Sequence, residues 1–219
     1  MIDFALFIDS LPTLLKGAVV TLKLASMSCL LGIIGGTLIG VVHTSKNTLI
    51  RLLVTLYVTI IRGTPMLIQI FIVRYLFPEI GISLPLFWSA VVAVGLNSSA
   101  YVSQIIRLGI DSVPRGQIEA AKVLGFTQFQ ITRLIVLPQA IKVVIPALGN
   151  ELVTLVKDSS LASVIGVVEL TKEGSILRST TLDVVTSFAA VGLIYLLMTS
   201  TISLAVHWLE SRMNTYAQH

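Results

Sequence analysis

The chain has 219 residues, of which 55% are hydrophobic and only 12% are charged, and its mean hydropathy is +0.94. Soluble domains carry about 25% charged residues, so this composition excludes an ordinary soluble domain and indicates an all-α integral membrane protein. The net charge of +4 comes from basic residues scattered between apolar stretches, which argues against nucleic-acid binding. The single cysteine, Cys29, excludes a disulfide framework.

Apolar stretches predict five membrane-spanning helices, because about 20 apolar residues are needed to cross a hydrocarbon core of ~30 Å. Three stretches carry no charge: 24–45, 80–106 and 184–209. Two others, 52–73 and 134–168, are interrupted. The first is broken by Arg62, Gly63, Thr64 and Pro65, and the second by Lys142, Glu151, Lys157 and Asp158, with Pro138 and Pro146 flanking that helix.

The distribution of charge predicts the orientation. Five spans place the two termini on opposite sides of the membrane. One side then carries eight basic and three acidic residues, and the other carries seven basic and eight acidic residues. The eight basic residues are Lys46, Arg51, Arg107, Arg115, Lys122, Arg133, Lys142 and Arg212. By the positive-inside rule this side is cytoplasmic, which leaves the amino terminus outside and the carboxyl terminus inside.

Residues 107–142 form the only long hydrophilic connection, so we treat residues 1–219 as a single transmembrane domain with one cytoplasmic loop. Pro114 is suited to open a helix and Gly125 to close it. This helix, with the small residues Ala120 and Ala121, either docks into a groove on a partner protein or rests on lipid headgroups or its own bundle.

A second short helix is predicted directly after the first. Thr127 and Gln130 have the spacing of a capping box, which marks a helix start, and Pro138 is expected to break this helix.

Polar residues inside the broken spans are candidates for a translocation path. Lipid cannot satisfy the backbone groups freed by Gly63 and Pro65, but a cavity or a neighbouring helix can. The candidate path residues are Asn97, Gln104, Glu151, Lys157 and Asp158. The alternative is a structural role, as an ion pair or as an anchor at the membrane surface.

Other polar residues indicate no chemistry. The three histidines, His43, His207 and His219, are too far apart to suggest a metal site, and Ser159 and Ser160 lack a nearby base. No glycine-rich phosphate-binding motif is present, so we expect no cofactor in this chain. Four glycines between Gly32 and Gly40 are suited to close helix packing, within the bundle or at a subunit interface.

The loop carries the most specific pattern. Glu119-Ala120-Ala121, three residues, Gly125, nine residues and then Ile135-x-Leu137-Pro138 resembles the EAA loop of ABC importer permeases. Further matching segments are 62–65 with Gln69 and Phe71, Leu96-Asn97 with Ala100-Tyr101 and Arg107, 137–140, 148–150 and 157–161. Together they resemble the permeases of polar amino acids, the histidine, glutamine, arginine and cystine group.

This resemblance implies a type I importer permease in the bacterial cytoplasmic (inner) membrane, a transport subunit and not an enzyme. It pairs with itself or a paralogue, sits over two cytoplasmic ATPase subunits that bind ATP and Mg, and receives a polar amino acid from an extracytoplasmic binding protein. The ATPase contact is expected at Glu119, Ala120, Ala121 and Gly125. Many relatives carry a glutamate where this chain has Gln104, which lowers the expectation of a cationic cargo.

Two other classes remain open on the residues alone. A secondary transporter, driven by an ion gradient, uses intramembrane charges without ATP, although no inverted repeat is evident. A membrane scaffold explains the apolar helices but not the loop spacing.

Overall fold

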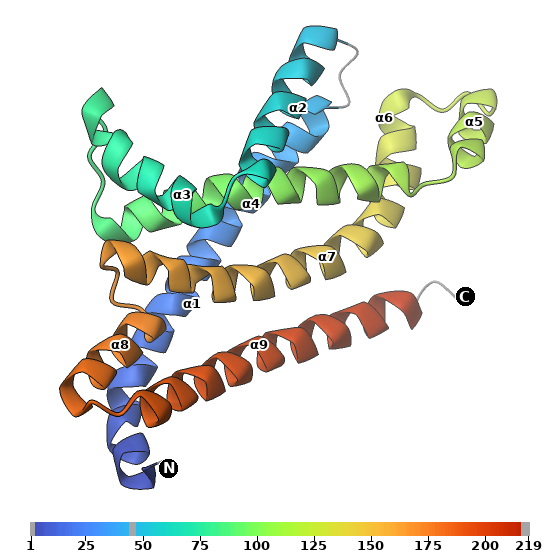
Figure 1. Ribbon diagram of the computed structural model, residues 1–219. Coiled ribbons are helices and arrows are strands. Elements are labelled where there is room, and N and C mark those ends of the chain that lie inside the picture. Colours follow the sequence, from blue (N-terminus) through green and yellow to red (C-terminus); the bar gives the residue numbers. More distant parts are fainter. Residues whose placement is uncertain (1–2, 44–46, 216–219) are drawn as a thin grey trace.

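The computed structural model describes residues 3–43 and 47–215, and the described residues form helices joined by short connections (Figure 1). In chain order these are α1 (Phe4–His43), α2 (Thr48–Gly63), α3 (Met66–Phe71), η1 (Ile72–Leu76), η2 (Pro78–Ile80), α4 (Leu86–Asp111), α5 (Arg115–Val123), α6 (Gln128–Ile131), η3 (Thr132–Val136), α7 (Leu137–Asp158), η4 (Ser159–Ile165), α8 (Leu170–Thr181) and α9 (Val184–Thr215). Of the short elements, η1 and η3 are π-helices and η2 and η4 are 3₁₀-helices.

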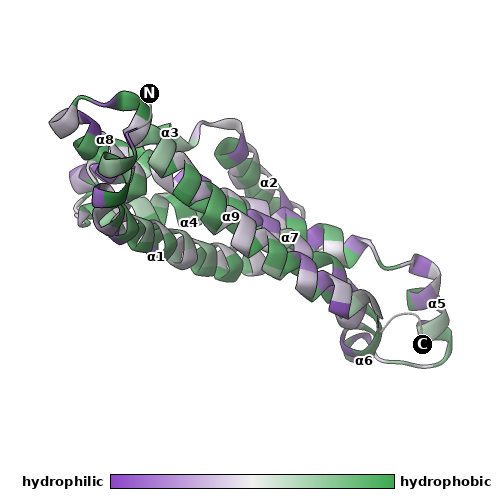
Figure 2. Ribbon diagram, turned by 90° about the horizontal axis from the view of Figure 1, so that it is seen from below, coloured by the Kyte–Doolittle hydropathy of each residue, from purple (hydrophilic) through white to green (hydrophobic). Residues whose placement is uncertain are grey.

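Four helical stretches in the described residues are long and apolar enough to cross a membrane, and a bent pair makes a fifth if it counts as one span. The four are 4–43, 86–111, 128–165 and 184–213, and the pair is α2 with 66–80. The first begins well before the predicted 24–45 because Lys16 and Lys23 lie on the exposed surface of α1 and do not interrupt it. In Figure 2 the long helices consist largely of hydrophobic residues.

The two ends of the bundle carry different elements. The start of α1 lies with α8 at one end, while α5, α6 and the end of α9 lie at the other, which we call the loop end (Figures 1 and 2). Within the described residues, α1 therefore begins and α9 finishes at opposite ends of the bundle. Lys46, one of the basic residues used to predict orientation, lies outside the described residues.

A line of small residues packs α1 closely against α4. A Cβ atom added at Gly32 would come within 2.7 Å of Ser98 Cβ, and one at Gly36 within 2.7 Å of the Ser99 carbonyl oxygen. Neither position has room for a side chain, so the helices approach closely only because these residues are glycines. Of the two roles open from the sequence, the structure shows packing within the bundle.

The sequence did not predict α8, which is fastened by a buried carboxylate. Glu169, fully buried before the first turn of α8, accepts hydrogen bonds from Lys172 N (2.8 Å), Tyr195 Oη (2.8 Å) and Thr21 Oγ1 (3.2 Å). Burial raises the pKa of this carboxyl, and the hydrogen bonds oppose the shift. One side chain thus ties α1, α8 and α9 together.

Pro138 does not break the helix, and this prediction was wrong. Elements α6, η3 and α7 form one continuous helical stretch, 128–165. The chain passes into α7 through the π-helical turn η3, in which Leu137 N bonds to Thr132 O, and Pro138 then occupies the first turn of α7. A first turn tolerates proline because its N–H has no helical partner. Pro146 lies within α7, which continues to Asp158.

Candidate functional site

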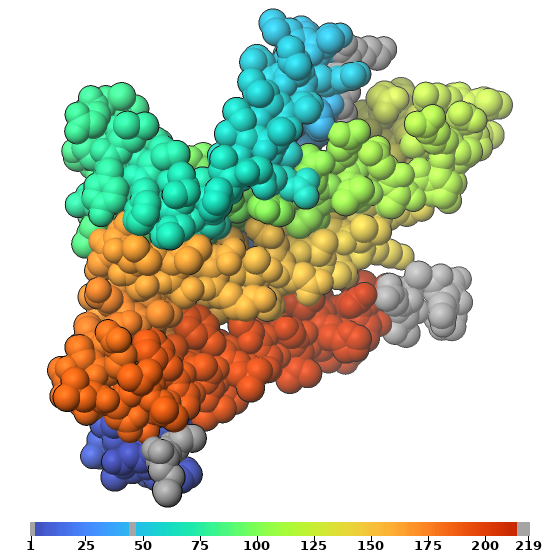
Figure 3. Space-filling view, viewed as in Figure 1, coloured from blue at the N-terminus to red at the C-terminus, as the bar shows by residue number. Residues whose placement is uncertain are grey.

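The chain turns sharply where α2 meets α3. α2 ends at Gly63, Thr64 is extended (φ −116°, ψ 145°), and Pro65 caps α3. The two helical segments are bent by 107°. In Figure 3 they stand as separate arms above the long helices. A bend of this kind leaves backbone carbonyl groups without helical partners, and these must be satisfied within the protein.

Gln69 supplies the missing donors. Its Nε2 donates to Ile61 O (2.7 Å), Thr64 O (3.1 Å) and Thr64 Oγ1 (2.9 Å). Its Oε1 accepts from Asn97 Nδ2 of α4 (2.9 Å). Gln69 and Asn97 are 6% and 7% exposed, so the broken helix is held to α4 by a buried pair of amides.

A small polar pocket of about 180 Å³ opens beside this break. It is lined by Thr64, Met66, Asn97, Tyr101, Glu151, Thr154 and Asp158. The residues from α7 lie at positions 151, 154 and 158, a spacing that places them on one helix face. Glu151 Oε1 also accepts from Ser98 Oγ (2.8 Å). In residues 3–43 and 47–215 no group of three or more His, Cys, Asp or Glu side chains is placed to hold a metal ion.

The structure brings three of the five candidate path residues together. Asn97, Glu151 and Asp158 line the pocket, whereas Lys157 is exposed and Gln104 does not line it. Lys157 and Asp158 are adjacent on α7, so their side chains point in different directions.

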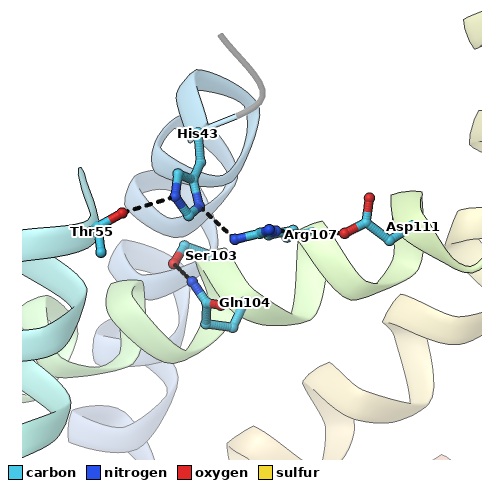
Figure 4. Close-up of polar contacts among 6 residues, drawn as sticks. All are labelled: His43, Thr55, Ser103, Gln104, Arg107 and Asp111. Carbon is cyan, nitrogen blue, oxygen red and sulfur yellow. Dashed lines mark hydrogen bonds and ion pairs between the residues drawn. The ribbon is translucent and has the colours of Figure 1, made fainter. Parts of the chain in front are cut away.

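Gln104 instead lies among polar residues towards the loop end of α4 (Figure 4). Its Nε2 is 3.5 Å from Ser103 Oγ. Beside it, Arg107 Nη1 lies 3.4 Å from His43 Nδ1 at the end of α1, and its Nε lies 3.5 Å from Asp111 Oδ2. His43 Nε2 is in turn 3.2 Å from Thr55 Oγ1 of α2. These exposed contacts join α1, α2 and α4 and are separate from the pocket.

Several residues of this site, Gln69 and Tyr101 among them, were not predicted as path residues. Gln69 holds the break, and Tyr101 lines the pocket with the Arg62 guanidinium 5.1 Å from its ring centroid. Arg62, expected only to interrupt a helix, therefore lies beside a pocket residue. The available signal was that Gln69 is the one polar side chain between Met66 and Val73.

The loop helix α5 has the two ends predicted from the sequence. Pro114 is its N-cap, and Gly125, beyond its C-terminus, has φ +79°. Gly125 N bonds to Lys122 O and Phe126 N bonds to Ala121 O, each at 3.0 Å. This pair of bonds is the Schellman arrangement, which requires a left-handed residue and favours glycine. The next helix starts at Thr127, where the predicted capping box with Gln130 is present.

The tip of the loop exposes apolar side chains. Val123 is 88% exposed, Leu124 75% and Phe129 70%. Glu119 and Ala120 are also exposed, whereas Ala121 is buried. Because these side chains lie in the hydrophilic loop, they form a candidate surface for contact with another molecule.

The family model for the inner membrane component of binding-protein-dependent transport systems matches residues 30–215. The chain belongs to this family. It is a membrane-spanning permease subunit of an ATP-binding cassette importer, and it resides in the inner membrane.

Curated relatives cover nearly the whole permease. It is 37% identical to the putative glutamine transport system permease protein GlnP of Rickettsia conorii, over 91% of this chain and 92% of that one. It is 39% identical to the nopaline transport system permease protein NocM of Agrobacterium fabrum, over 96% and 93%. It is also 39% identical to the L-cystine transport system permease protein TcyB of Bacillus subtilis, over 94% and 88%.

Solved structures share the fold of this permease. A chain of an amino acid ABC transporter crystallised with histidines superposes with a TM-score of 0.92 at 37% identity, covering 97% of this chain and 99% of that one. A chain of the inward-facing MetNI methionine ABC transporter gives 0.76 at 22% identity, over 91% and 95%, which supports the fold alone. These relatives favour the ATP-driven importer over an ion-gradient transporter or a scaffold.

Proposed function

We propose that this permease carries a polar amino acid through the membrane and binds it at the pocket beside the helix break. The observation that carries the proposal is the pocket itself, in which Glu151 and Asp158 come together with Asn97 beside the helix break. Two half-buried carboxyl groups suit the α-ammonium group of an amino acid. Relatives that carry glutamine, cystine or nopaline in their names support cargo of this class.

The other end of an amino acid needs a positive partner. The guanidinium of Arg62 lies over the Tyr101 ring at the edge of the pocket and is the basic group that we assign to the cargo carboxylate. Gln104 and Lys157 have no assigned contact with cargo in this arrangement. We keep them as path residues only for the passage between the pocket and either end of the bundle.

The loop, 107–142, is proposed to face the cytoplasm, with the amino terminus outside and the carboxyl terminus inside. The positive-inside rule supports this orientation, because Arg107, Arg115, Lys122 and Arg133 all lie at the loop end. This orientation makes the loop accessible to a cytoplasmic ATPase.

The ATPase contact is proposed at Glu119, Ala120, Ala121 and Gly125. Exposed Glu119 and Ala120, next to the apolar tip, support a docking surface on α5, while Gly125 fixes how this helix ends. ATP and Mg are bound by the two ATPase subunits. A second permease subunit, the same chain or a paralogue, and an extracytoplasmic binding protein complete the assembly, and this chain needs no cofactor of its own.

The test is ATP hydrolysis by the permease reconstituted in liposomes with its ATPase and binding protein. Glutamine, cystine, arginine, histidine and glutamate are added in turn. We expect one of them to stimulate hydrolysis and to be taken up. A stable complex that none of them stimulates would overturn the amino acid assignment, and failure to bind any ATPase would overturn the loop assignment.

A further inference from the structure

The loop helix α5 is joined to α7 by one side-chain hydrogen bond in addition to the chain itself. Gln139 Nε2, in the first turns of α7, donates to Gln117 Oε1 of α5 at 2.7 Å. The same nitrogen donates to Ile135 O, in the π-helical turn η3, at 2.9 Å. Both hydrogens of one amide are therefore used, one across the loop and one within the helix.

Apart from this bond, the angle of α5 is set by packing at the buried Ala121 and by its connections along the chain. Its backbone lies against α6 and η3, and most of its side chains are exposed. Pro114 at one end and Gly125 at the other connect it through turns. The Gln117–Gln139 bond joins two residues 22 positions apart and so closes the loop at its base.

The helix that carries Gln139 also carries the pocket carboxyl groups. Gln139 and Glu151 are twelve residues apart on α7, which corresponds to about 18 Å along an α-helix. The helix α7 continues through Pro146 without a break, and a continuous helix can transmit a displacement over such a distance. The bond therefore connects the surface assigned to the ATPase with the element that forms one wall of the pocket.

We infer that Gln139 is a positioning residue that passes movement of α5 to α7 by holding Gln117 and the Ile135 carbonyl together. The inference rests on the proposed coupling role of the loop. Gln139 contacts neither cargo nor nucleotide, and it acts by keeping α5 at a fixed angle to α7. When the bond is lost, α5 still reaches the ATPase but moves α7 less, through its packing on α6 and η3 alone.

The test uses the complete complex of permease, ATPase and binding protein in liposomes. Gln139→Leu removes the donor and keeps a good helix former of similar size. Gln128→Leu is the matched control, because Gln128 is an exposed glutamine of the same loop whose side chain forms no hydrogen bond in the described residues. Basal hydrolysis, the maximal stimulated rate and the half-saturating concentration of binding protein are measured for each variant.

We expect Gln139→Leu to lower the stimulated increment in hydrolysis by about tenfold, within the usual range of coupling between two sites. In Gln139→Leu, the basal rate of ATP hydrolysis and the half-saturating concentration of binding protein stay as in the wild type. Gln128→Leu changes none of the three measured quantities. The double variant Gln117→Leu with Gln139→Leu is no worse than Gln139→Leu alone, because both changes remove one bond. Gln117→Glu with Gln139→Lys, which replaces that bond by an ion pair, restores part of the stimulation.

Two results would overturn the inference. Unchanged stimulation of ATP hydrolysis in Gln139→Leu means that the bond does not transmit movement from α5 to α7. A parallel fall in basal rate, stimulated rate and bound ATPase means that Gln139 only supports folding. A wild-type complex without any stimulation would instead refute the proposed function on which the inference rests.

Discussion

The pocket and the loop tip differ in burial. Polar side chains beside the pocket are buried and hydrogen-bonded, whereas apolar side chains at the tip are exposed. At the pocket, Gln69 and Asn97 are almost fully buried and bonded to each other and to the broken helix. At the tip, Val123 and Leu124 are largely exposed. The first region is preorganised by its own residues, whereas the second is the surface that we propose to bind a partner.

Because of this difference, substitutions in the two regions are expected to have different effects. A change at the tip is expected to leave the fold intact and to remove communication with the partner. A change at the pocket is expected to alter cargo binding or the local stability of the break. The predictions below follow this division, from the largest expected effect to the smallest.

Glu119→Lys combined with Gly125→Val should abolish stimulated hydrolysis. The first change reverses a charge on the docking surface, and the second places a β-branched residue at φ +79°, at a cost of about 1–3 kcal/mol. Stimulated ATP hydrolysis is the measurement. Gly116→Ala, in the open first turn of the same helix, is the control and should have no effect. Stimulation that survives the double change would contradict the loop assignment.

Glu151→Gln should reduce amino acid uptake while the complex still assembles. Loss of a charge that pairs with the cargo ammonium costs about 2 kcal/mol or more, which lowers uptake at least about tenfold at subsaturating substrate. Asp158→Asn should act in the same direction. Glu79→Gln is the matched control, since it removes an exposed carboxylate that does not line the pocket. Equal losses for Glu79→Gln and Asp158→Asn would refute the pocket.

Gln69→Leu should destabilise the break. It leaves the Asn97 amide and the carbonyl groups of Ile61 and Thr64 without their partner, and an unsatisfied buried group costs about 1–3 kcal/mol. Thermal unfolding of the purified complex measures the effect. Gln104→Leu removes only a 3.5 Å contact with Ser103 and should lower the unfolding temperature less. The reverse order would show that Gln69 does not hold the break.

Asp183 should give a small dependence of stability on pH. This partly exposed residue precedes α9 and accepts hydrogen bonds from Thr186 N (2.9 Å) and Thr186 Oγ1 (2.7 Å), which lower the pKa of its carboxyl. Because the folded pKa lies below the unfolded one, the contribution is present above the unfolded pKa and is lost as the pH falls through the folded value.

Unfolding temperatures of the wild type and Asp183→Asn, compared from pH 6 to pH 2, test this prediction. The difference between them should shrink on acidification. A difference that stays constant with pH would contradict the assignment.

Sequence patterns located the parts of the fold that depend on local chemistry. The turn at Gly63 and Pro65, the ends of α5 at Pro114 and Gly125, and the capping box at Thr127 were each predicted from residue type and spacing. These features are set by proline, glycine and hydroxyl groups within a few residues, so a single chain segment is enough to reveal them.

Features that depend on distant contacts were missed or misread. Pro138 was expected to end a helix, but the helix continues because the π-helical turn η3 directly before α7 accommodates the proline. The helix α8 is short and depends on Glu169 bonding to Thr21 and Tyr195, residues far away in the sequence. For the same reason Lys157 and Gln104 could not be separated from Asp158 and Asn97 by spacing alone.

Equilibrium binding of the cargo amino acid to the purified complex, without binding protein, tests the central claim most directly. Wild type, Glu151→Gln and the Glu119→Lys with Gly125→Val variant are compared. We predict that the loop variant binds the amino acid as the wild type does and that Glu151→Gln loses this binding. Full binding by Glu151→Gln, or an equal loss in the loop variant, would contradict the division into a cargo pocket and a partner-binding loop.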